Sequence, residues 1–242
     1  MDDDEPAKGS AFTVLKASHF TLPDKIVIPQ QRDLNTQTAN TGKLSIASST
    51  ITKSKAINGL TYYHVDQFSP TIDESVKVLL NGPQIVEGYQ RRAIFDIIYR
   101  VQDSLVFIFT SKFHVVHLLN RFRELPAGQV WVEPLIFNFG NATEIPEITN
   151  IRAVWEKEYD VNVKTVGRFG TNVNKSNKVH LPEATAISFL LEDEGSVYAL
   201  AMSCEGRIGS RNIIKKEKEV KLFDKYLKHM VQASTHSSKN KS

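Results

Sequence analysis

The sequence has little of what would stabilise a chain covalently or hold it in a membrane. Among 242 residues there is one cysteine, Cys204, which excludes an internal disulfide framework and a zinc site built from several cysteines. The longest strongly apolar run, Leu105–Phe109, is a fraction of the roughly 20 residues that a spanning helix needs. Residues 2–5 are all acidic, which is the opposite of a signal peptide. We therefore expect a reducing, cytoplasmic location and no membrane partner.

The usual catalytic signatures are also missing. The chain has no Gly-x-Gly-x-x-Gly or Walker sequence for nucleotides and no Gly-x-Ser-x-Gly elbow for a serine nucleophile. Cys204 ends an apolar run, where cysteine usually behaves as a small hydrophobe. His114 and His117 are three residues apart, but no His-Glu-x-x-His motif accompanies them. No metal and no cofactor are expected, and a non-enzymatic protein is favoured.

The overall composition is that of a globular protein. Hydrophobic residues make up 41% and charged residues 24%, which is enough to form a sizeable core. We expect one α/β globular domain over 11–232, with a possible soft boundary near 70–83. The polar ends, 1–10 and 233–242, are expected to be disordered tails, and Gln30–Gly42 is expected to be a mobile loop.

The periodicity of apolar residues predicts the elements of the first half. Alternating residues predict antiparallel strands at 11–17, 24–29, 43–52 and 60–68. Pro70 suits the first turn of a helix that runs to Leu80. Apolar residues at spacings of three and four, among them Ala93, Ile97 and Val101, predict a longer helix over 83–102.

The second half reads as a central βαβ unit followed by a hairpin and a helix. The unit consists of a strand at 104–110, a helix at 112–125 and a strand at 129–139, which predicts a parallel strand pair with a right-handed crossover. A helix at 145–159, a strand at 161–166, a hairpin of 185–191 with 196–204 and a helix at 213–231 follow. The fold class expected is mixed α/β or α+β, with antiparallel N-terminal strands, the βαβ unit, the C-terminal hairpin and the terminal helix.

A short segment around Glu87 resembles a known phosphate-handling motif. Residues 85–93 read Ile-Val-Glu-Gly-Tyr-Gln-Arg-Arg-Ala, which resembles the Asp-Gly-Gln-x-Arg stretch of ParB-like and related nuclease folds, with Glu87 for Asp and Tyr89 for Gln. The resemblance implies a helix N-terminus at which Arg91 and Arg92 bind phosphate. However, the helix expected over 83–102 removes the strand that the motif needs, so no family is assigned. An amphipathic helix with both arginines exposed is the alternative.

The clearest functional signal is the distribution of charge. The net charge is only +3, but residues 161–182 contain four cations and no carboxylate, and a second basic stretch begins at Arg207. Cations on a flexible Gly- and Asn-rich loop suit phosphate contacts, and Phe169 in that loop can stack a base or anchor the loop. The candidate nucleic-acid-binding residues are Lys164, Arg168, Lys175, Lys178, Arg207, Arg211, Lys215 and Lys216. A solvated loop and an ordinary basic helix remain the alternative.

Three functional hypotheses follow from these patterns. The first is a binding protein that contacts the backbone of DNA or RNA through the basic C-terminal third, with little sequence preference. The second is a protein-interaction subunit of a larger intracellular complex. The third is a metal-dependent nuclease or other phosphoryl-transfer enzyme with Glu87, Arg91 and Arg92 near its site.

Overall fold

Residue contacts divide the chain into two compact units. The computed structural model describes residues 10–29, 48–71, 77–79, 83–85, 89–157 and 165–232. Unit 1 comprises residues 1–14 and 134–242, and unit 2 comprises residues 15–133. The expected soft boundary near 70–83 falls inside unit 2, whereas the chain passes between the units after Val14 and after Glu133. The expected tails at 1–9 and 233–242 and the expected loop at 30–42 lie outside the described residues.

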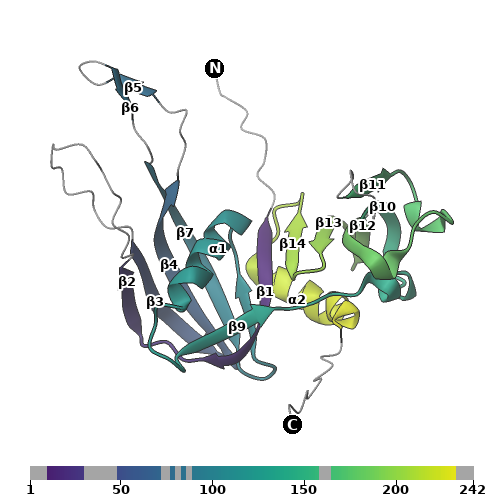
Figure 1. The fold of residues 1–242 in the computed structure, drawn as a ribbon. Coiled ribbons are helices and arrows are strands. Elements are labelled where there is room, and N and C mark those ends of the chain that lie inside the picture. Colours follow the sequence, from purple (N-terminus) through teal and green to yellow (C-terminus); the bar gives the residue numbers. More distant parts are fainter. Residues whose placement is uncertain are drawn as a thin grey trace, which may run out of the picture. The chain divides into compact units, whose positions relative to one another are not determined.

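Unit 2 is built on one antiparallel sheet (Figure 1). Its strands follow the order β1-β8-β7-β4-β3-β2, and β9 also pairs with β1. Their bounds are β1 Ala11–Phe20, β2 Lys25–Pro29, β3 Ser48–Ile57, β4 Leu60–Thr71, β7 Tyr89–Arg100, β8 Leu105–Ile108 and β9 Val130–Pro134. A separate antiparallel pair is formed by β5 Lys77–Leu79 and β6 Pro83–Ile85. The expected N-terminal strands are confirmed, although β3 ends later than predicted and residues 43–47 of that prediction lie outside the described residues.

The two helices expected between 70 and 102 are wrong. Pro70 and Thr71 end β4, and most of the longer predicted helix is strand β7. Along β7, Phe95 and Ile97 are buried and Ala93 is partly buried, while Ile94, between Ala93 and Phe95, is 56% exposed, which is the alternation of a strand. A spacing of four residues fits both a helix face and alternate positions of a strand, so Ala93 and Ile97 did not discriminate between the two.

The central βαβ prediction is half right. Strand β8 and helix α1, Lys112–Phe122, are confirmed. The parallel pair is wrong, because β8 and β9 each hydrogen-bond to β1 rather than to each other. Strand β1, from the start of the chain, therefore pairs with both strands that the sequence predicted to pair with each other.

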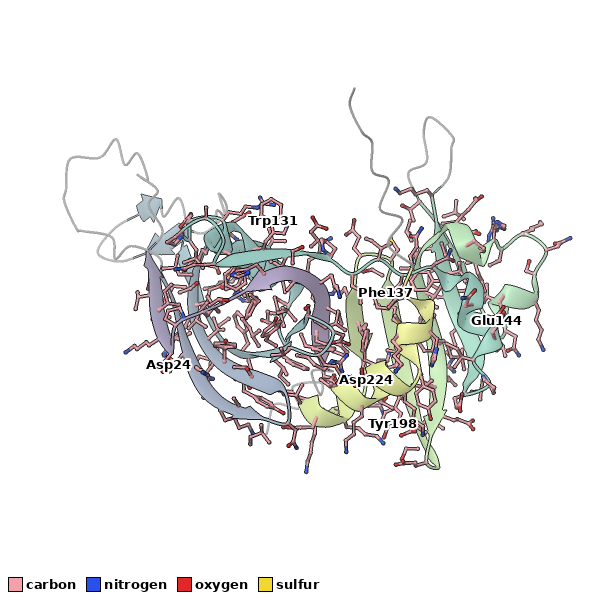
Figure 2. All side chains as sticks on the ribbon, turned by 90° about the horizontal axis from the view of Figure 1, so that it is seen from below. Asp24, Trp131, Phe137, Glu144, Tyr198 and Asp224 are labelled. Carbon is pink, nitrogen blue, oxygen red and sulfur yellow. The ribbon has the colours of Figure 1, made fainter. Side chains whose placement is uncertain are left out.

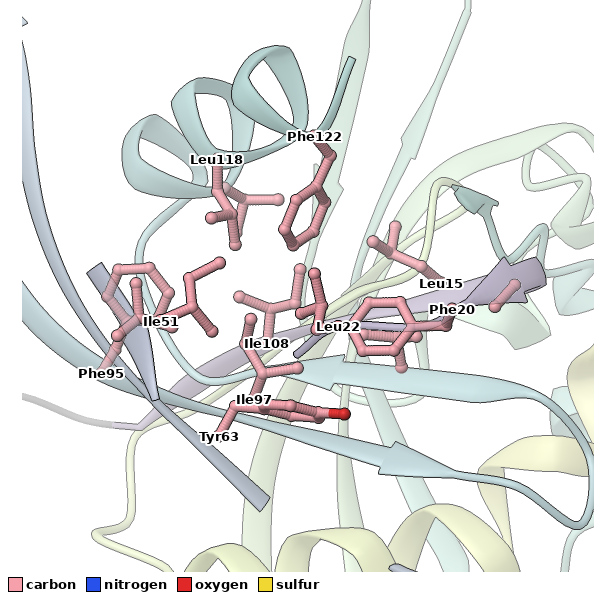
Figure 3. Packing of buried hydrophobic residues seen from close by; sticks show 14 of the residues in the cluster. Leu15, Phe20, Leu22, Ile51, Tyr63, Phe95, Ile97, Ile108, Leu118 and Phe122 are labelled. Carbon is pink, nitrogen blue, oxygen red and sulfur yellow. The ribbon is translucent and has the colours of Figure 1, made fainter. Parts of the chain in front are cut away.

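The core of unit 2 lies between the curved sheet and α1. Figure 2 shows the sheet curving around its side chains, and Figure 3 shows Leu118 and Phe122 of α1 directed onto residues of the sheet. Ile51, Ile97 and Ile108 are fully buried beneath the helix. At one end Phe20 packs edge-on against Phe122 with 6.0 Å between ring centroids.

Unit 1 is a second antiparallel arrangement, with strand order β11-β10-β12-β13-β14-β1. Its remaining strands are β10 Ile148–Glu156, β11 Val166–Phe169, β12 Ala184–Asp193, β13 Ser196–Ser203 and β14 Arg207–Ser210. Its helical segments are α2 Lys216–Lys225 and the short 3-10 turns η1 Phe139–Glu144, η2 Val173–Lys175, η3 Leu181–Glu183 and η4 Leu227–Met230.

Among the predictions for the C-terminal part of the chain, some are confirmed and others are wrong. The hairpin of β12 and β13 is confirmed, turning at Glu194 and Gly195. The helix expected at 145–159 is wrong, since 148–156 is strand β10. The terminal helix is shorter than predicted, and residues 161–164 of the expected strand lie outside the described part of the chain. With 51% strand and 21% helix, the protein is predominantly antiparallel β rather than mixed α/β.

One face of the unit 1 sheet is covered by α2. Val154, Ile187, Met202 and Ile208 lie in one row across four strands and are all buried. Asp193, on the same face by alternation along β12, hydrogen-bonds to Lys218 and Lys225 of α2 and to Tyr226 at its end.

Among the described residues, no helix is long and apolar enough to cross a membrane.

The backbone of Val14 joins three segments of unit 1. Its N–H donates to the carbonyl of Gly206 at 2.8 Å, and its carbonyl accepts from the N–H of Leu135 at 3.2 Å. Gly206 has a φ of +84°, and a Cβ placed there would lie 2.4 Å from the Val14 oxygen and 3.0 Å from the Leu135 oxygen. Both obstacles are backbone atoms, so no side-chain movement can relieve them.

We expect Gly206→Ala to lower the free energy of unfolding by about 3 kcal/mol or more, because β1 must move away from the turn. Gly195→Ala is the matched control, since Gly195 also has a positive φ of +77° but no atom lies within 4 Å of its Cβ position. The control should lose only about 1–2 kcal/mol, the cost of a left-handed conformation. Urea unfolding measures both, and equal losses would contradict the close packing at Val14.

Candidate nucleic-acid interface

The edge strand β11 presents an exposed aromatic ring. Phe169 is 71% exposed, and its ring meets the Trp155 ring of β10 edge-on, with 5.5 Å between centroids and 88° between planes. Phe169 pairs with Ala153, and this row continues through Ser188 and Ala201. We call this surface the Phe169 face; it consists of Ala153, Trp155, Gly167, Phe169, Ser188 and Ala201. It lies opposite the face that α2 covers.

Gly167 allows the Phe169 ring to lie back along its own strand. A Cβ at Gly167 would be 2.9 Å from Cε2 of Phe169 and 3.3 Å from Cδ1 of Trp155. Gly167 and Phe169 lie on the same side of β11, and Gly167 pairs with Trp155. The ring therefore lies over Gly167 and meets Trp155 edge-on, while 71% of the residue is exposed.

The loop that follows Phe169 is tied to β10. The N–H of Gly170 donates to the carbonyl of Arg152 at 3.0 Å, and the N–H of Asn172 donates to Oδ1 of Asn150 at 2.8 Å. Val173 is buried against this anchor. Lys175 and Lys178 follow, and both side chains are exposed. Neither lysine forms an ion pair with a described residue.

Arg168 does not belong to the same surface. Alternation along β11 directs it to the other face, where its Nε lies 3.1 Å from Oε2 of Glu156. Oε1 of Glu156 accepts from the N–H of His180 at 2.6 Å, which closes the loop. This arginine is therefore a partner of Glu156. Lys164, the first candidate of the basic loop, lies outside the described residues.

The second basic segment lies at the other side of the sheet. From β11 to β14 there are four strand spacings, or about 19 Å. Arg207 on β14 is half-buried, and burial lowers the pKa of its guanidinium. Arg211 and Lys215 are exposed, whereas Lys216 is partly buried at the start of α2. The structure therefore separates the two groups of predicted cations instead of merging them.

Arg91 and Arg92 lie on strand β7 of unit 2, not at a helix N-terminus. Arg92 forms a bidentate ion pair with Asp66, with both N–O distances 2.9 Å. This pair lowers the pKa of the Asp66 carboxyl. The Arg91 guanidinium lies 5.9 Å from the centre of the Phe113 ring. Glu87 lies outside the described residues. Phosphate binding by this segment is therefore supported by the sequence alone.

Comparison with known proteins gives no family. No protein-family model matches the chain, and no curated protein matches its sequence. The candidate site therefore depends on its own chemistry.

The other candidate centres show no arrangement for catalysis. Burial raises the pKa of the Cys204 thiol, which disfavours the reactive thiolate. The described residues contain no group of three or more His, Cys, Asp or Glu side chains that could hold a metal ion. Burial lowers the pKa of His114, which keeps it neutral at its contact with Ser69.

Sequence reasoning missed two features of this unit. Trp155 was placed on a helix, although the alternation of Ile151, Ala153 and Trp155 was available as a strand signal. Two lysines of α2 are also engaged within the protein, so the number of lysines in this helix overstates the cations available to a ligand. Lys218 and Lys225 donate to opposite oxygens of the buried Asp193 carboxylate at 2.5 and 2.6 Å. These hydrogen bonds lower the pKa of Asp193.

Beside this ion pair lies a shallow hollow of about 330 Å³. It is lined by Asp193, Glu194, Lys218, Lys221, Leu222, Asp224 and Lys225. Three acidic and three basic side chains therefore share one small surface, which favours neither an anion nor a cation. We place no binding site there.

Glu219, in the first turn of α2, is a buried acid. It is 3% exposed, and its Oε1 has no hydrogen-bond partner among the described residues. Burial raises its pKa to about 7, while a hydrogen bond with Ser10 and the charge of Lys216 act in the opposite direction. The carboxyl is therefore protonated in the folded chain at mildly acidic pH.

We expect this acid to make unit 1 less stable as pH rises. Its pKa of about 7 exceeds the ordinary value of 4.5, so the unfolded chain loses its proton first and stability falls between these two values. The total loss is about 3 kcal/mol, the free-energy equivalent of the shift. In urea unfolding across this range, Glu219→Gln should remove the dependence, while Glu217→Gln, an exposed control on the same helix, should keep it. An unchanged slope in Glu219→Gln would contradict this account.

Proposed function

We propose that this chain is a non-enzymatic protein that binds the phosphate backbone of nucleic acid at the free edge of unit 1. The observation that carries the proposal is the pair of exposed lysines, Lys175 and Lys178, on the loop that follows the exposed Phe169 and is hydrogen-bonded to β10. Exposed cations that form no ion pair with the described carboxylates are available to phosphate. A tethered loop also loses less conformational entropy on binding than a free one.

Arg211 and Lys215 form a second, separate set of exposed cations. A strand of nucleic acid that reaches both sets has to cross about 19 Å of sheet, or several nucleotides. Binding through Lys175 and Lys178 alone requires a shorter segment. Dependence of affinity on oligonucleotide length distinguishes these two modes.

The alternative of a protein-interaction subunit has one supporting observation. Ile213, between β14 and α2, is 77% exposed, and Val197 in the hairpin is 49% exposed. Apolar contacts of this kind change little with salt, unlike phosphate contacts. Retention of a protein partner at high salt, without binding of nucleic acid, would favour this alternative. The phosphoryl-transfer hypothesis requires Mg²⁺-dependent cleavage that is lost in Glu87→Ala.

The proposal predicts that the double variant Lys175→Glu/Lys178→Glu binds nucleic acid about tenfold more weakly or worse. The logarithmic dependence of affinity on salt should become shallower by about one unit for each lysine lost. Fluorescence anisotropy with labelled oligonucleotides at several salt concentrations measures both quantities.

The matched control is Lys25→Glu/Lys112→Glu, which alters two exposed lysines of unit 2. Each Lys→Glu change removes one positive charge and adds one negative charge, so both double variants move the net charge from +3 to −1. If the control weakens binding as much as Lys175→Glu/Lys178→Glu does, net charge rather than this edge governs binding. Such a result would overturn the proposal.

A further inference from the structure

We infer that the nucleic acid bound at this edge is single-stranded, with an unpaired base stacked on Phe169. The inference rests on the proposed function and adds the class of ligand. It follows from the exposure of the ring, from the small side chains on the neighbouring strands and from the lysines of the loop that follows the ring.

The Phe169 ring packs against one neighbour and remains largely exposed. Trp155 contacts it edge-on, and Gly167 leaves the space in which it lies. With 71% of the residue exposed, a broad part of the ring remains available. Aromatic rings in fixed positions are the usual platforms on which single-stranded nucleic acid stacks its bases.

On the strands beyond β10, the side chains in the row of Phe169 are small. Ser188 and Ala201, in the same row of the sheet, carry small side chains, and Ala201 is exposed. From the side of Ser188 and Ala201, a purine or a pyrimidine therefore meets only small side chains. Recognition by stacking is tolerant of sequence, because every base has a π-face.

Duplex nucleic acid does not fit this arrangement. In a duplex each base is already stacked between its neighbours and paired at its edge, so its face is not available to Phe169. The lysines would still attract a duplex through its phosphates. We therefore expect weak, purely electrostatic binding of duplex and tighter binding of single strands.

The charges beside the ring favour nucleic acid over a protein partner. Lys175 follows Phe169 by six residues, on a loop whose start is tied to β10. Lysine is depleted from the core of protein interfaces, whereas exposed cations together with an exposed aromatic ring suit the phosphates and the bases of nucleic acid. Glu156, the last residue of β10, faces the other side of the sheet and is paired with Arg168.

The test compares oligothymidylate with a hairpin duplex of equal charge, using fluorescence anisotropy of the full chain. The wild-type protein should bind the single strand more tightly. Phe169→Ala should weaken oligothymidylate binding by about 5- to 150-fold, the range measured for loss of one stacked base, and leave duplex binding unchanged. Phe169→Trp should retain the affinity, whereas Phe169→Leu, which keeps an apolar side chain without a π-face, should not.

Trp131→Ala is the control, since Trp131 is an aromatic residue of unit 2 that is 63% exposed (Figure 2). It should bind both ligands as the wild-type protein does. Gly167→Ala gives a second test, because its Cβ displaces the Phe169 ring and should weaken single-strand binding alone. Thermal unfolding of each variant verifies that the fold persists.

The possible failures are distinguishable. If Lys175→Glu/Lys178→Glu weakens binding but Phe169→Ala does not, the backbone proposal stands and the stacking inference is overturned. Equal affinity of the wild-type protein for single strand and duplex also overturns it. If the wild-type protein binds neither ligand, both proposals are wrong.

Discussion

The hydrogen bonds of the Val14 backbone are the constraint on which unit 1 depends. The N–H and the carbonyl of this residue engage Gly206 and Leu135, so the first strand, the segment entering from β9 and the turn before β14 meet at one point. A side chain at position 206 has no room there, because its Cβ would fall within 2.4 Å of the Val14 oxygen. Strand β1 is thereby fixed in register with β14, and from β14 the antiparallel order passes through β13, β12 and β10 to the free edge at β11. The position of the candidate site is a consequence of this chain of pairings.

At that edge, the two faces of the sheet serve different purposes. The face with Val154 and Ile187 is buried, and Arg168 at its rim is neutralised by Glu156. The opposite face has mostly small residues and one exposed ring, which lies over Gly167 and contacts Trp155 edge-on. Strand alternation thus separates two adjacent residues, Arg168 and Phe169, into a structural role and a proposed binding role. The sequence alone presents them as members of one basic loop.

Local patterns identified the elements whose periodicity is unambiguous, such as α1 and the β12–β13 hairpin. They failed where apolar residues at spacings of four satisfied both helix and strand, as at Ala93 and Ile97, and this error also hid Trp155 from the candidate site. Pairing partners distant in the chain were out of reach as well. Nothing near β8 or β9 in the sequence indicates that β1 pairs with both. The exposed lysines of the loop were predictable from composition, whereas the neutralisation of Arg168 depends on register.

The central claim is that nucleic acid binds at the free edge of unit 1 and stacks on Phe169. Nuclear magnetic resonance mapping of the full chain during titration with unlabelled oligothymidylate tests it most directly, because ring stacking moves the signals of the ring and its neighbours. The account predicts progressive shifts at Gly167, Phe169 and the loop that carries Lys175 and Lys178, with upfield movement of the Phe169 ring protons. Shifts confined to residues 15–133 or to α2, with the edge of β11 unchanged, would contradict it.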